Sequence, residues 1–165
     1  MNRVRICALD KSVATAGFHC GQTALDDYIA RYAAQDIRRN VARVFVATPV
    51  AEPHRLAGFF SLSAGSVNCA DLPAGLAKKL PRYPVPVARI GRLAVGLEFQ
   101  GQGLGSVLLA DVCQKVAQAS ATLAVVGIVV DAKDGAAASF YQRFGFLPLP
   151  GSLGRWLLPA AAFGA

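Results

Sequence analysis

A glycine-rich loop near the middle of the chain has the composition of an anion-binding site. The loop, Gln100–Gly105, reads QGQGLG and follows the apolar run Ile90–Val95. From the loop onwards every fourth residue is apolar, which is typical of one face of a helix: Leu104, Leu108, Val112 and Val116. Glycines let a backbone approach a ligand closely, and the first N–H groups and the dipole of a helix attract negative charge. The sequence therefore predicts a strand, a loop and a helix that together bind a diphosphate.

Three kinds of nucleotide-binding loop can be compared with this one. A Walker A loop ends in Gly-Lys-Ser/Thr, and no lysine follows Gly105. A Rossmann fingerprint needs a third glycine where this chain has Ser106, and Asp131 lies farther along the chain than the usual ribose-binding acid. The spacing of Gln100, Gly103 and Gly105 fits a third kind, Q-x-x-G-x-G. A tight turn that only joins a strand to a helix is the alternative.

The composition is that of one folded domain with a sizeable core. Hydrophobic residues make up 54% of the 165 residues and charged residues 16%, which excludes a disordered chain. The longest apolar-leaning stretches, Leu56–Ala70 and Val116–Val130, are shorter than the roughly 20 residues that cross a bilayer. The apolar run at the start is too short for a signal peptide. We expect a single domain over residues 1–165, no membrane and a cytoplasmic location.

The four cysteines favour reduced thiols over a metal site or a disulfide framework. Cys7, Cys20, Cys69 and Cys113 show no C-x-x-C spacing, and no paired histidines accompany them. Thiols stay reduced in a cytoplasm. We therefore expect buried free cysteines and no metal.

The positive charge is concentrated in one segment, between Arg31 and Arg92. This segment holds ten basic residues and only three acidic ones, so it carries the whole net charge of +7. The remaining residues have seven charges of each sign. Such a one-sided distribution suits a polyanion such as nucleic acid, but an ordinary solvated surface fits it equally well.

Strand and helix patterns surround the loop and predict a mixed α/β fold. We expect strands over residues 4–9, 42–48, 55–64, 90–95, 123–130, 146–149 and 155–158. The nearly continuous apolar texture of 123–130 is typical of a strand that is covered on both faces and parallel to 90–95. Between Ser66 and Pro86 we expect an insert with a short helix ending at Lys79, after which Pro81, Pro84 and Pro86 prevent regular structure.

Two further helices carry recognisable ends or stripes. A helix over 24–40 would have Thr23 as its N-cap and an apolar stripe: Leu25, Tyr28, Ile29 and Tyr32. The last helix would begin at the N-cap Asp134 and end at the C-cap Gly145. His19, in the turn before the first of these helices, is more typical of a structural residue than of a ligand.

A second motif, in addition to the loop, lies at Ala138–Phe146 in the last expected helix. It reads ASFYQRFGF, and its part from Phe140 to Phe146 resembles the F-Y-x-x-x-G-F portion of the A-x-x-F-Y-x-x-x-G-F signature of the GCN5-related N-acetyltransferases, the GNAT superfamily. The Q-x-x-G-x-G loop resembles the acetyl-CoA loop of the same family, and the two motifs follow in the family's order. The resemblance implies the GNAT fold, a central mixed sheet flanked by helices, with acetyl-CoA as co-substrate.

The resemblance also implies roles for individual residues. The diphosphate would lie on the loop backbone, formed by Gln100, Gly101, Gln102, Gly103, Leu104, Gly105 and Ser106. The pantetheine arm would pair with Leu93, Ala94 and Val95, and an N–H near Val95 would stabilise the oxyanion of the tetrahedral intermediate. Tyr141 would donate a proton to the departing sulfur. The alternative for Tyr141 is a core aromatic residue on a helical stripe.

The N-terminal half narrows the resemblance to one group of GNAT proteins. Phe18-x-Cys20-Gly21, Ala24–Tyr28, Ser61–Ser66 and Gly91–Val95 together resemble the GNAT toxins of bacterial type II toxin–antitoxin modules. Those toxins acetylate the α-amino group of aminoacyl-tRNA and are paired with ribbon-helix-helix antitoxins. The resemblance also suggests a homodimer. The tRNA backbone would then be held by basic residues of the charged segment: Arg38, Arg39, Lys78, Lys79, Arg82 and Arg92.

A dedicated general base is not evident in the sequence. A lysine amine has a pKa of about 10.4, whereas an α-amino group is about half neutral near pH 8 and needs less help. Glu98 and Asp131 are the acids nearest to the proposed centre in sequence, and neither lies in a base motif. Two other functions stay open: a GNAT enzyme acting on a protein N-terminus or a small amine, and a CoA-binding module without activity.

Overall fold

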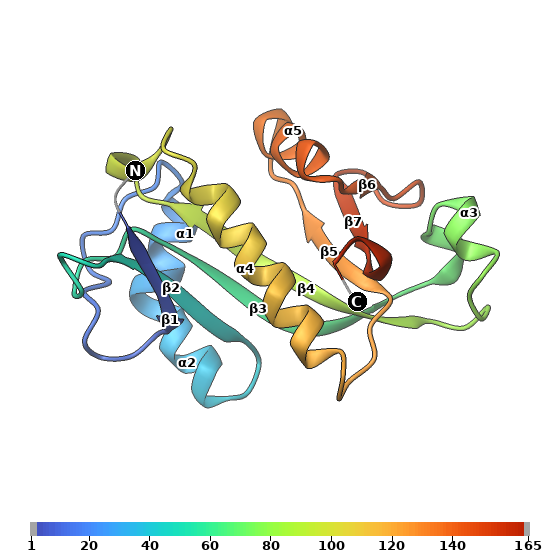
Figure 1. Cartoon of the computed structure of the whole chain (residues 1–165), viewed down its shortest axis with the longest axis horizontal. Helices are drawn as coiled ribbons and strands as arrows, with labels where there is room; N and C mark the ends of the chain where they lie inside the picture. The colour runs from blue at the N-terminus through green and yellow to red at the C-terminus, as the bar shows by residue number, and fades with distance from the viewer. Residues whose placement is uncertain (1–2, 164–165) are drawn as a thin grey trace. The chain divides into compact units, whose positions relative to one another are not determined.

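The computed structural model describes residues 3–163 (Figure 1). Within this range seven strands form a sheet in the order β1-β2-β3-β4-β5-β7-β6. The strands are β1 (Val4–Ala8), β2 (Arg43–Pro49), β3 (Gly58–Val67), β4 (Val85–Val95), β5 (Gly127–Asp131), β6 (Leu147–Pro148) and β7 (Arg155–Pro159). β4 and β5 are parallel, whereas β1–β2, β2–β3, β5–β7 and β6–β7 are antiparallel. The predicted mixed sheet, with 90–95 parallel to the strand before the last helix, is therefore confirmed.

The chain divides into two compact units, and each is described by itself. The first unit contains Met1–Ser63 and Gly91–Val112, and the second contains Ala64–Ile90 and Cys113–Ala165. Among the described residues, no helix is both long enough and apolar enough to cross a membrane.

In the first unit the expected helix over 24–40 is divided by a π-helical turn. α1 (Thr23–Asp27) continues into π-helix η1 (Tyr28–Tyr32) and then into α2 (Ala33–Arg38). A π-turn takes more residues than an α-turn, so it rotates the side chains that follow it. Ala33 consequently takes the buried position, and the side chain of Tyr32 is 53% exposed. The prediction that Tyr32 completes the apolar stripe is wrong for this reason.

The predicted N-cap of this helix is also wrong. Gln22 is the N-cap, without a side-chain hydrogen bond, and Thr23 is the first helical residue. The nearby carboxylate of Asp26 accepts a hydrogen bond of 2.9 Å from the N–H of Cys20 instead. The acid in the first turn therefore fixes the preceding turn of the chain.

The helices and the strands of the first unit share one hydrophobic core. Its buried residues come from the N-terminal loop, the helices, three strands and the segment between β2 and β3: Val13, Phe18, Cys20, Leu25, Tyr28, Ile29, Ala33, Val44, Val46, Leu56, Phe59 and Ala94. The helix that follows the glycine-rich loop is α4 (Leu104–Ala119). It buries all four members of the predicted stripe, namely Leu104, Leu108, Val112 and Val116.

The second unit contains the proline-rich segment and the last helix. Its core is formed by Val67, Leu72, Val85, Val87, Val129, Leu149 and Leu157. The 3-10 helix η2 (Cys69–Asp71) and the short helix α3 (Ala74–Ala77) occupy the predicted insert. α5 (Gly135–Phe144) has the predicted ends, because Asp134 accepts a 2.8 Å hydrogen bond from Ala137 N–H and Gly145 has a φ of +112°.

Three predicted strand limits need correction. β4 begins at Val85 and includes Pro86, so prolines do not exclude regular structure there. Proline lacks an N–H, but its carbonyl still accepts, and Pro86 O takes a 2.9 Å hydrogen bond from Val126 N–H. β3 extends to Val67, beyond the expected end at residue 64. β5 begins only at Gly127, and Leu123 and Ala124 of the expected strand are exposed.

Candidate functional site

The backbone of the glycine-rich loop has a conformation that requires glycine. After β4 and the 3-10 helix η3 (Leu97–Phe99), the loop passes through Gly101 and Gly103, whose φ angles are +77° and +84°. Residues that carry a Cβ rarely adopt such φ angles. Gly101, Gln102, Gly103 and Ser106 are exposed, so side chains do not close the loop. Alternation of left-handed and ordinary residues turns successive N–H groups to one side, which is the geometry of an anion nest.

The N–H groups of this loop are available to a ligand. Among the described residues, no acceptor is hydrogen-bonded to the backbone N–H groups of residues 101–106. They lie at the start of α4, a 16-residue helix whose dipole favours an anion there. The N–H of Gln100 differs, because it donates to Leu97 O over 3.4 Å. In this structure the N–H of Gln100 is thus turned to the preceding 3-10 helix, and its predicted contribution to the anion site stays a prediction.

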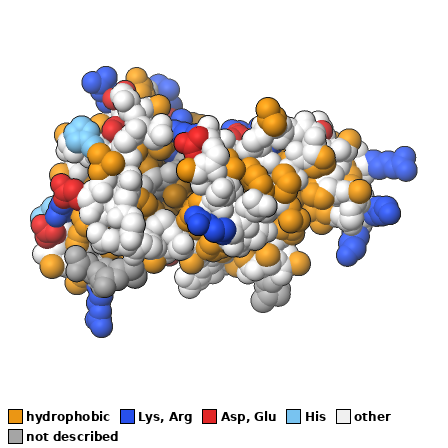
Figure 2. Space-filling model, turned by 90° about the horizontal axis from the view of Figure 1, so that it is seen from above, with side chains coloured by type: hydrophobic (Ala, Val, Ile, Leu, Met, Phe, Trp, Pro, Cys, Tyr) orange, Lys and Arg blue, Asp and Glu red, His pale blue; other side chains and the backbone are white. Residues whose placement is uncertain are grey.

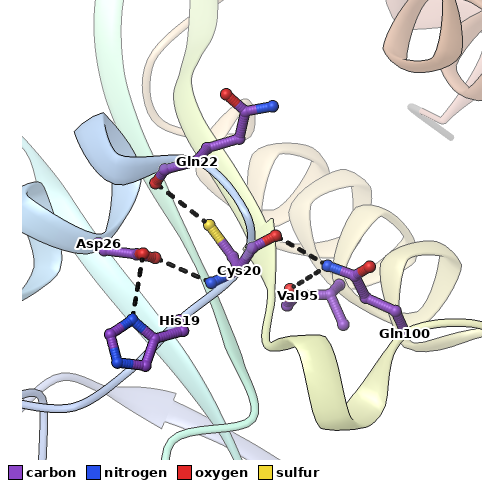
Figure 3. Close-up of polar contacts among 6 residues, drawn as sticks. All are labelled: His19, Cys20, Gln22, Asp26, Val95 and Gln100. Atoms are coloured by element: carbon purple, nitrogen blue, oxygen red, sulfur yellow. Dashed lines mark hydrogen bonds and ion pairs between the residues drawn. The ribbon is translucent and has the colours of Figure 1, made fainter.

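The side chain of Gln100 makes two hydrogen bonds that the sequence did not indicate. Its Nε2 donates to Cys20 O and to Val95 O, each over 2.9 Å (Figure 3). The carboxylate of Asp26 accepts a hydrogen bond from the N–H of Cys20, and its Oδ2 lies 3.6 Å from Nδ1 of His19. His19 itself is an exposed residue of the turn rather than a core residue.

The end of β4 brings a buried residue and two half-buried ones next to the loop. Ala94 is 4% exposed, and Leu93 and Val95 are half-buried. A Cβ on Gly58 of β3 would lie 2.8 Å from Ala94 O, so the two backbones approach closely at this point. The predicted pairing of residues 93–95 with an extended ligand would use their backbone groups, and among these Val95 O accepts a hydrogen bond from Gln100 Nε2.

Tyr141 combines a buried ring with an unpaired hydroxyl. The residue, on α5 of the second unit, is 6% exposed and packs against Phe140 and Phe146. Burial raises the pKa of its phenol to about 12. The hydroxyl has no hydrogen-bond partner among the described residues, and it is not sealed from solvent. The group is therefore protonated at neutral pH and free to donate.

The two acids considered as bases are both paired with arginines. Glu98, in the first unit, forms an ion pair with Arg55. Asp131, the last residue of β5 as expected, accepts from Arg89 over 3.0 Å and from Arg155 over 2.9 Å. Both oxygens of Asp131 are thus engaged. Each acid is therefore held in an ion pair with arginine.

The six basic residues predicted to bind nucleic acid are all exposed. Arg38, Arg39 and Arg92 belong to the first unit, and Lys78, Lys79 and Arg82 to the second. Figure 2 shows Lys and Arg side chains gathered near α3, which Lys78 and Lys79 follow directly. Among residues 3–163 no group of three or more His, Cys, Asp or Glu side chains could hold a metal ion. Within residues 3–163 none of the four cysteines forms a disulfide, but only Cys20 and Cys69 are buried, so the expectation of burial is wrong for Cys7 and Cys113.

Comparison with known proteins finds several whose sequence or structure is similar to that of this chain. The model of the Acetyltransferase (GNAT) family matches residues 18–146. The chain is 37% identical over 129 residues to a tRNA-acetylating toxin of Mycobacterium tuberculosis, covering 78% of this chain and 75% of the relative. It is also similar to AtaT complexed with acetyl-methionyl-tRNAfMet, with a TM-score of 0.91, 27% identity and coverage of 97% and 96% of the two chains. The structure of AtaTR bound with AcCoA has a TM-score of 0.84, 27% identity and coverage of 97% and 95%. The family match spans both the loop before α4 and Tyr141, and the chain therefore belongs to the GNAT family of acetyltransferases.

Proposed function

We propose that this acetyltransferase is the toxin of a toxin–antitoxin module and acetylates the α-amino group of an aminoacyl-tRNA. The observation that carries the proposal is the set of unpaired N–H groups over residues 101–106, in a chain whose relative is a tRNA-acetylating toxin. The loop suits the diphosphate of acetyl-CoA, and the exposed basic residues suit a nucleic-acid acceptor.

The cofactor side of the reaction rests on backbone groups of the first unit. The N–H groups of residues 101–106 bind the diphosphate, and Leu93–Val95 pairs with the pantetheine arm as an added strand would. The N–H near Val95 then donates to the thioester oxygen, where negative charge develops in the tetrahedral intermediate. A donor in this position is worth about 100-fold or more in rate.

Tyr141 protonates the leaving group. The substrate amine attacks the thioester carbon and the C–N bond forms. As the C–S bond breaks, Tyr141 donates its phenolic proton to the departing sulfur in the same step, because a free thiolate, with a thiol pKa of about 8.5, is too weak a base to take that proton afterwards. The amine loses its extra proton to water, and the phenolate regains a proton from water. The raised pKa of Tyr141 keeps the donor protonated at neutral pH.

The pairing of Glu98 and Asp131 with arginines is compatible with this acceptor. An α-amino group is about half neutral near pH 8, so it can attack without a dedicated base. A lysine side chain, with a pKa of about 10.4, would need one. Among the described residues, Glu98 and Asp131 are held by arginines, which supports the α-amino acceptor over lysine.

The acceptor's phosphates are bound by exposed cations. Arg38, Arg39, Lys78, Lys79, Arg82 and Arg92 supply contacts that depend on charge and set affinity rather than sequence preference. We further propose that residues 1–165 act as one catalytic domain without a metal, in a cytoplasm, as a homodimer. A ribbon-helix-helix antitoxin is the proposed inhibitor.

A transfer assay with labelled acetyl-CoA tests the proposed acceptor. The protein is incubated with total aminoacyl-tRNA, with the same tRNA after deacylation, and with free amino acids and peptides. We expect label only on charged tRNA. Equal label on free amines without tRNA would instead identify a general amine acetyltransferase. CoA binding without any transfer would identify a binding module.

A further inference from the structure

We propose that Gln100 is a positioning residue, whose side chain holds the acetyl-CoA loop in place without touching the diphosphate. This inference rests on the proposed acetyl-CoA site. The Nε2 atom of Gln100 carries two hydrogens, and both are donated to main-chain carbonyls, Cys20 O and Val95 O, at 2.9 Å. The main-chain N–H of Gln100 donates to Leu97 O. Gln100 has no donor left for an anion.

The two carbonyls belong to segments that need to be held together. Cys20 lies 80 residues before Gln100 in the chain, in the turn that precedes α1. Val95 is the last residue of β4, where the proposed pantetheine arm and thioester lie. A second link joins the same segments, because Leu97 N–H donates to His19 O over 2.8 Å. Gln100 therefore ties the turn before α1 to the end of the strand and to the loop.

The Cys20 end of this connection is itself fixed from the other side. Cys20 N–H donates to Asp26 Oδ1 over 2.9 Å, and its carbonyl accepts from Gln100, so hydrogen bonds hold this residue on both faces (Figure 3). Cys20 is buried, which makes the loss of either bond costly. Asp26, on α1, thus supports the acetyl-CoA loop through Cys20 and Gln100.

The substitution Gln100→Met tests this role while keeping the length of the side chain. It removes both donors, so the end of β4 and the loop lose their shared anchor. We expect the affinity for CoA, measured by calorimetry, to fall about tenfold, the loss of roughly one net hydrogen bond. The affinity for pantetheine, measured by NMR titration, should fall by a similar factor, although pantetheine has no diphosphate. Loss confined to CoA would show direct phosphate contact and overturn the proposal, as would unchanged affinity for both.

Variants of Asp26 give a second test that does not alter the loop. Asp26→Ala removes the acceptor for Cys20 and should weaken CoA binding several-fold, and its effect should be less than additive with that of Gln100→Met. Asp26→Asn keeps an acceptor oxygen and should restore binding. Additive effects, or no rescue by asparagine, would contradict the connection.

A matched control lies in the same turn. The side chain of Gln22 is exposed and points away from the network (Figure 3), so Gln22→Ala should bind CoA like the wild type. All these readouts use CoA or pantetheine alone. They therefore remain informative if the acceptor proves not to be tRNA, whereas a wild-type protein that binds no CoA would refute the proposed site itself.

Discussion

The guanidinium carbon of Arg92 lies 3.7 Å from the centroid of the Tyr28 ring. The Tyr28 hydroxyl donates to Asp36 Oδ2 over 3.0 Å, so three side chains from β4, η1 and α2 form a chain within the first unit. Burial, followed by the bond to Asp36, raises the pKa of Tyr28 to about 12 against the opposing charge of Arg92. The stack fixes the plane of the exposed Arg92 guanidinium. An arginine side chain without such a stack would not have a fixed plane.

Replacing Arg92 should weaken tRNA binding and its dependence on salt. If Arg92 contacts one phosphate, Arg92→Ala lowers the slope of log affinity against log salt by about 0.7 to 0.9. Arg92→Lys keeps the charge but loses the stacked plane, so it should retain the slope and still bind more weakly. Filter binding or fluorescence anisotropy over a salt series measures both values. Arg5→Ala, an exposed arginine outside the basic segment, is the control, and an equal slope change there would dismiss a specific role for Arg92.

The cations after α3 should contribute independently of Arg92. Replacing Lys78, Lys79 and Arg82 together by alanine removes three exposed charges from the second unit. We expect the salt slope to fall by about 2 to 3, with weaker binding of charged and deacylated tRNA alike. Lys133→Ala, an exposed lysine of the same unit outside the basic segment, should leave the slope unchanged. A triple variant with wild-type binding would show that these cations are only part of a solvated surface.

Removing the charge of Asp131 should leave catalysis intact. Its carboxylate is held by Arg89 and Arg155, so it does not act as the general base. Asp131→Asn should keep the wild-type profile of kcat against pH and lose at most about 1 kcal/mol of stability, because the ion pairs are exposed. Loss of the acidic limb of that profile, where the rate rises as a base is deprotonated, would instead identify Asp131 as a proton acceptor.

The features that sequence predicted correctly depend on short-range rules. The caps of α5, Asp134 and Gly145, follow from residues within a few positions of one another. The stripe of α4 follows from a regular four-residue spacing. Local spacing is visible in a sequence because helices and turns impose it on neighbouring residues.

The features that sequence missed depend on contacts between distant segments. Nothing near Gln100 indicates that its side chain reaches Cys20, and nothing near Tyr28 indicates that η1 will rotate Tyr32 outwards. Pro86 can be part of β4 because it lacks only the backbone N–H, and its carbonyl oxygen still accepts a hydrogen bond from Val126 N–H. In each case the partner is selected by tertiary packing, which overrides the local preference.

A methyl group added at Gly58 should destabilise the first unit. The new Cβ would lie 2.8 Å from Ala94 O and 3.1 Å from a methyl carbon of Leu108, and Gly58 is buried. Because a backbone carbonyl cannot move aside without shifting β4, Gly58→Ala should lower the free energy of unfolding by about 1 to 3 kcal/mol. Gly75→Ala on α3, where the Cβ meets no atom within 4 Å, should be neutral or stabilising by up to about 1 kcal/mol. Chemical denaturation compares the two variants, and equal effects would contradict the close approach of β3 and β4.

Tyr141→Phe should separate catalysis from folding. The variant keeps the packed ring but removes the proton donor, so kcat should fall about 100-fold or more while the affinity for acetyl-CoA stays within about twofold. Tyr83→Phe, at an exposed tyrosine of the same unit, should keep the wild-type rate. Unaltered turnover in Tyr141→Phe would refute the donor role.

The pH dependence of stability gives an independent measure of the same phenol. Folding raises the pKa of Tyr141 from about 10 to about 12, so it favours the neutral form. The stability gained from this shift is fully present below pH 10 and is lost as pH rises through about 12. The difference in free energy of unfolding between wild type and Tyr141→Phe should therefore be constant up to about pH 10 and then move against the wild type. A difference that stays flat to pH 12 would show that the phenol titrates normally, and burial would then no longer explain why it remains a proton donor during turnover.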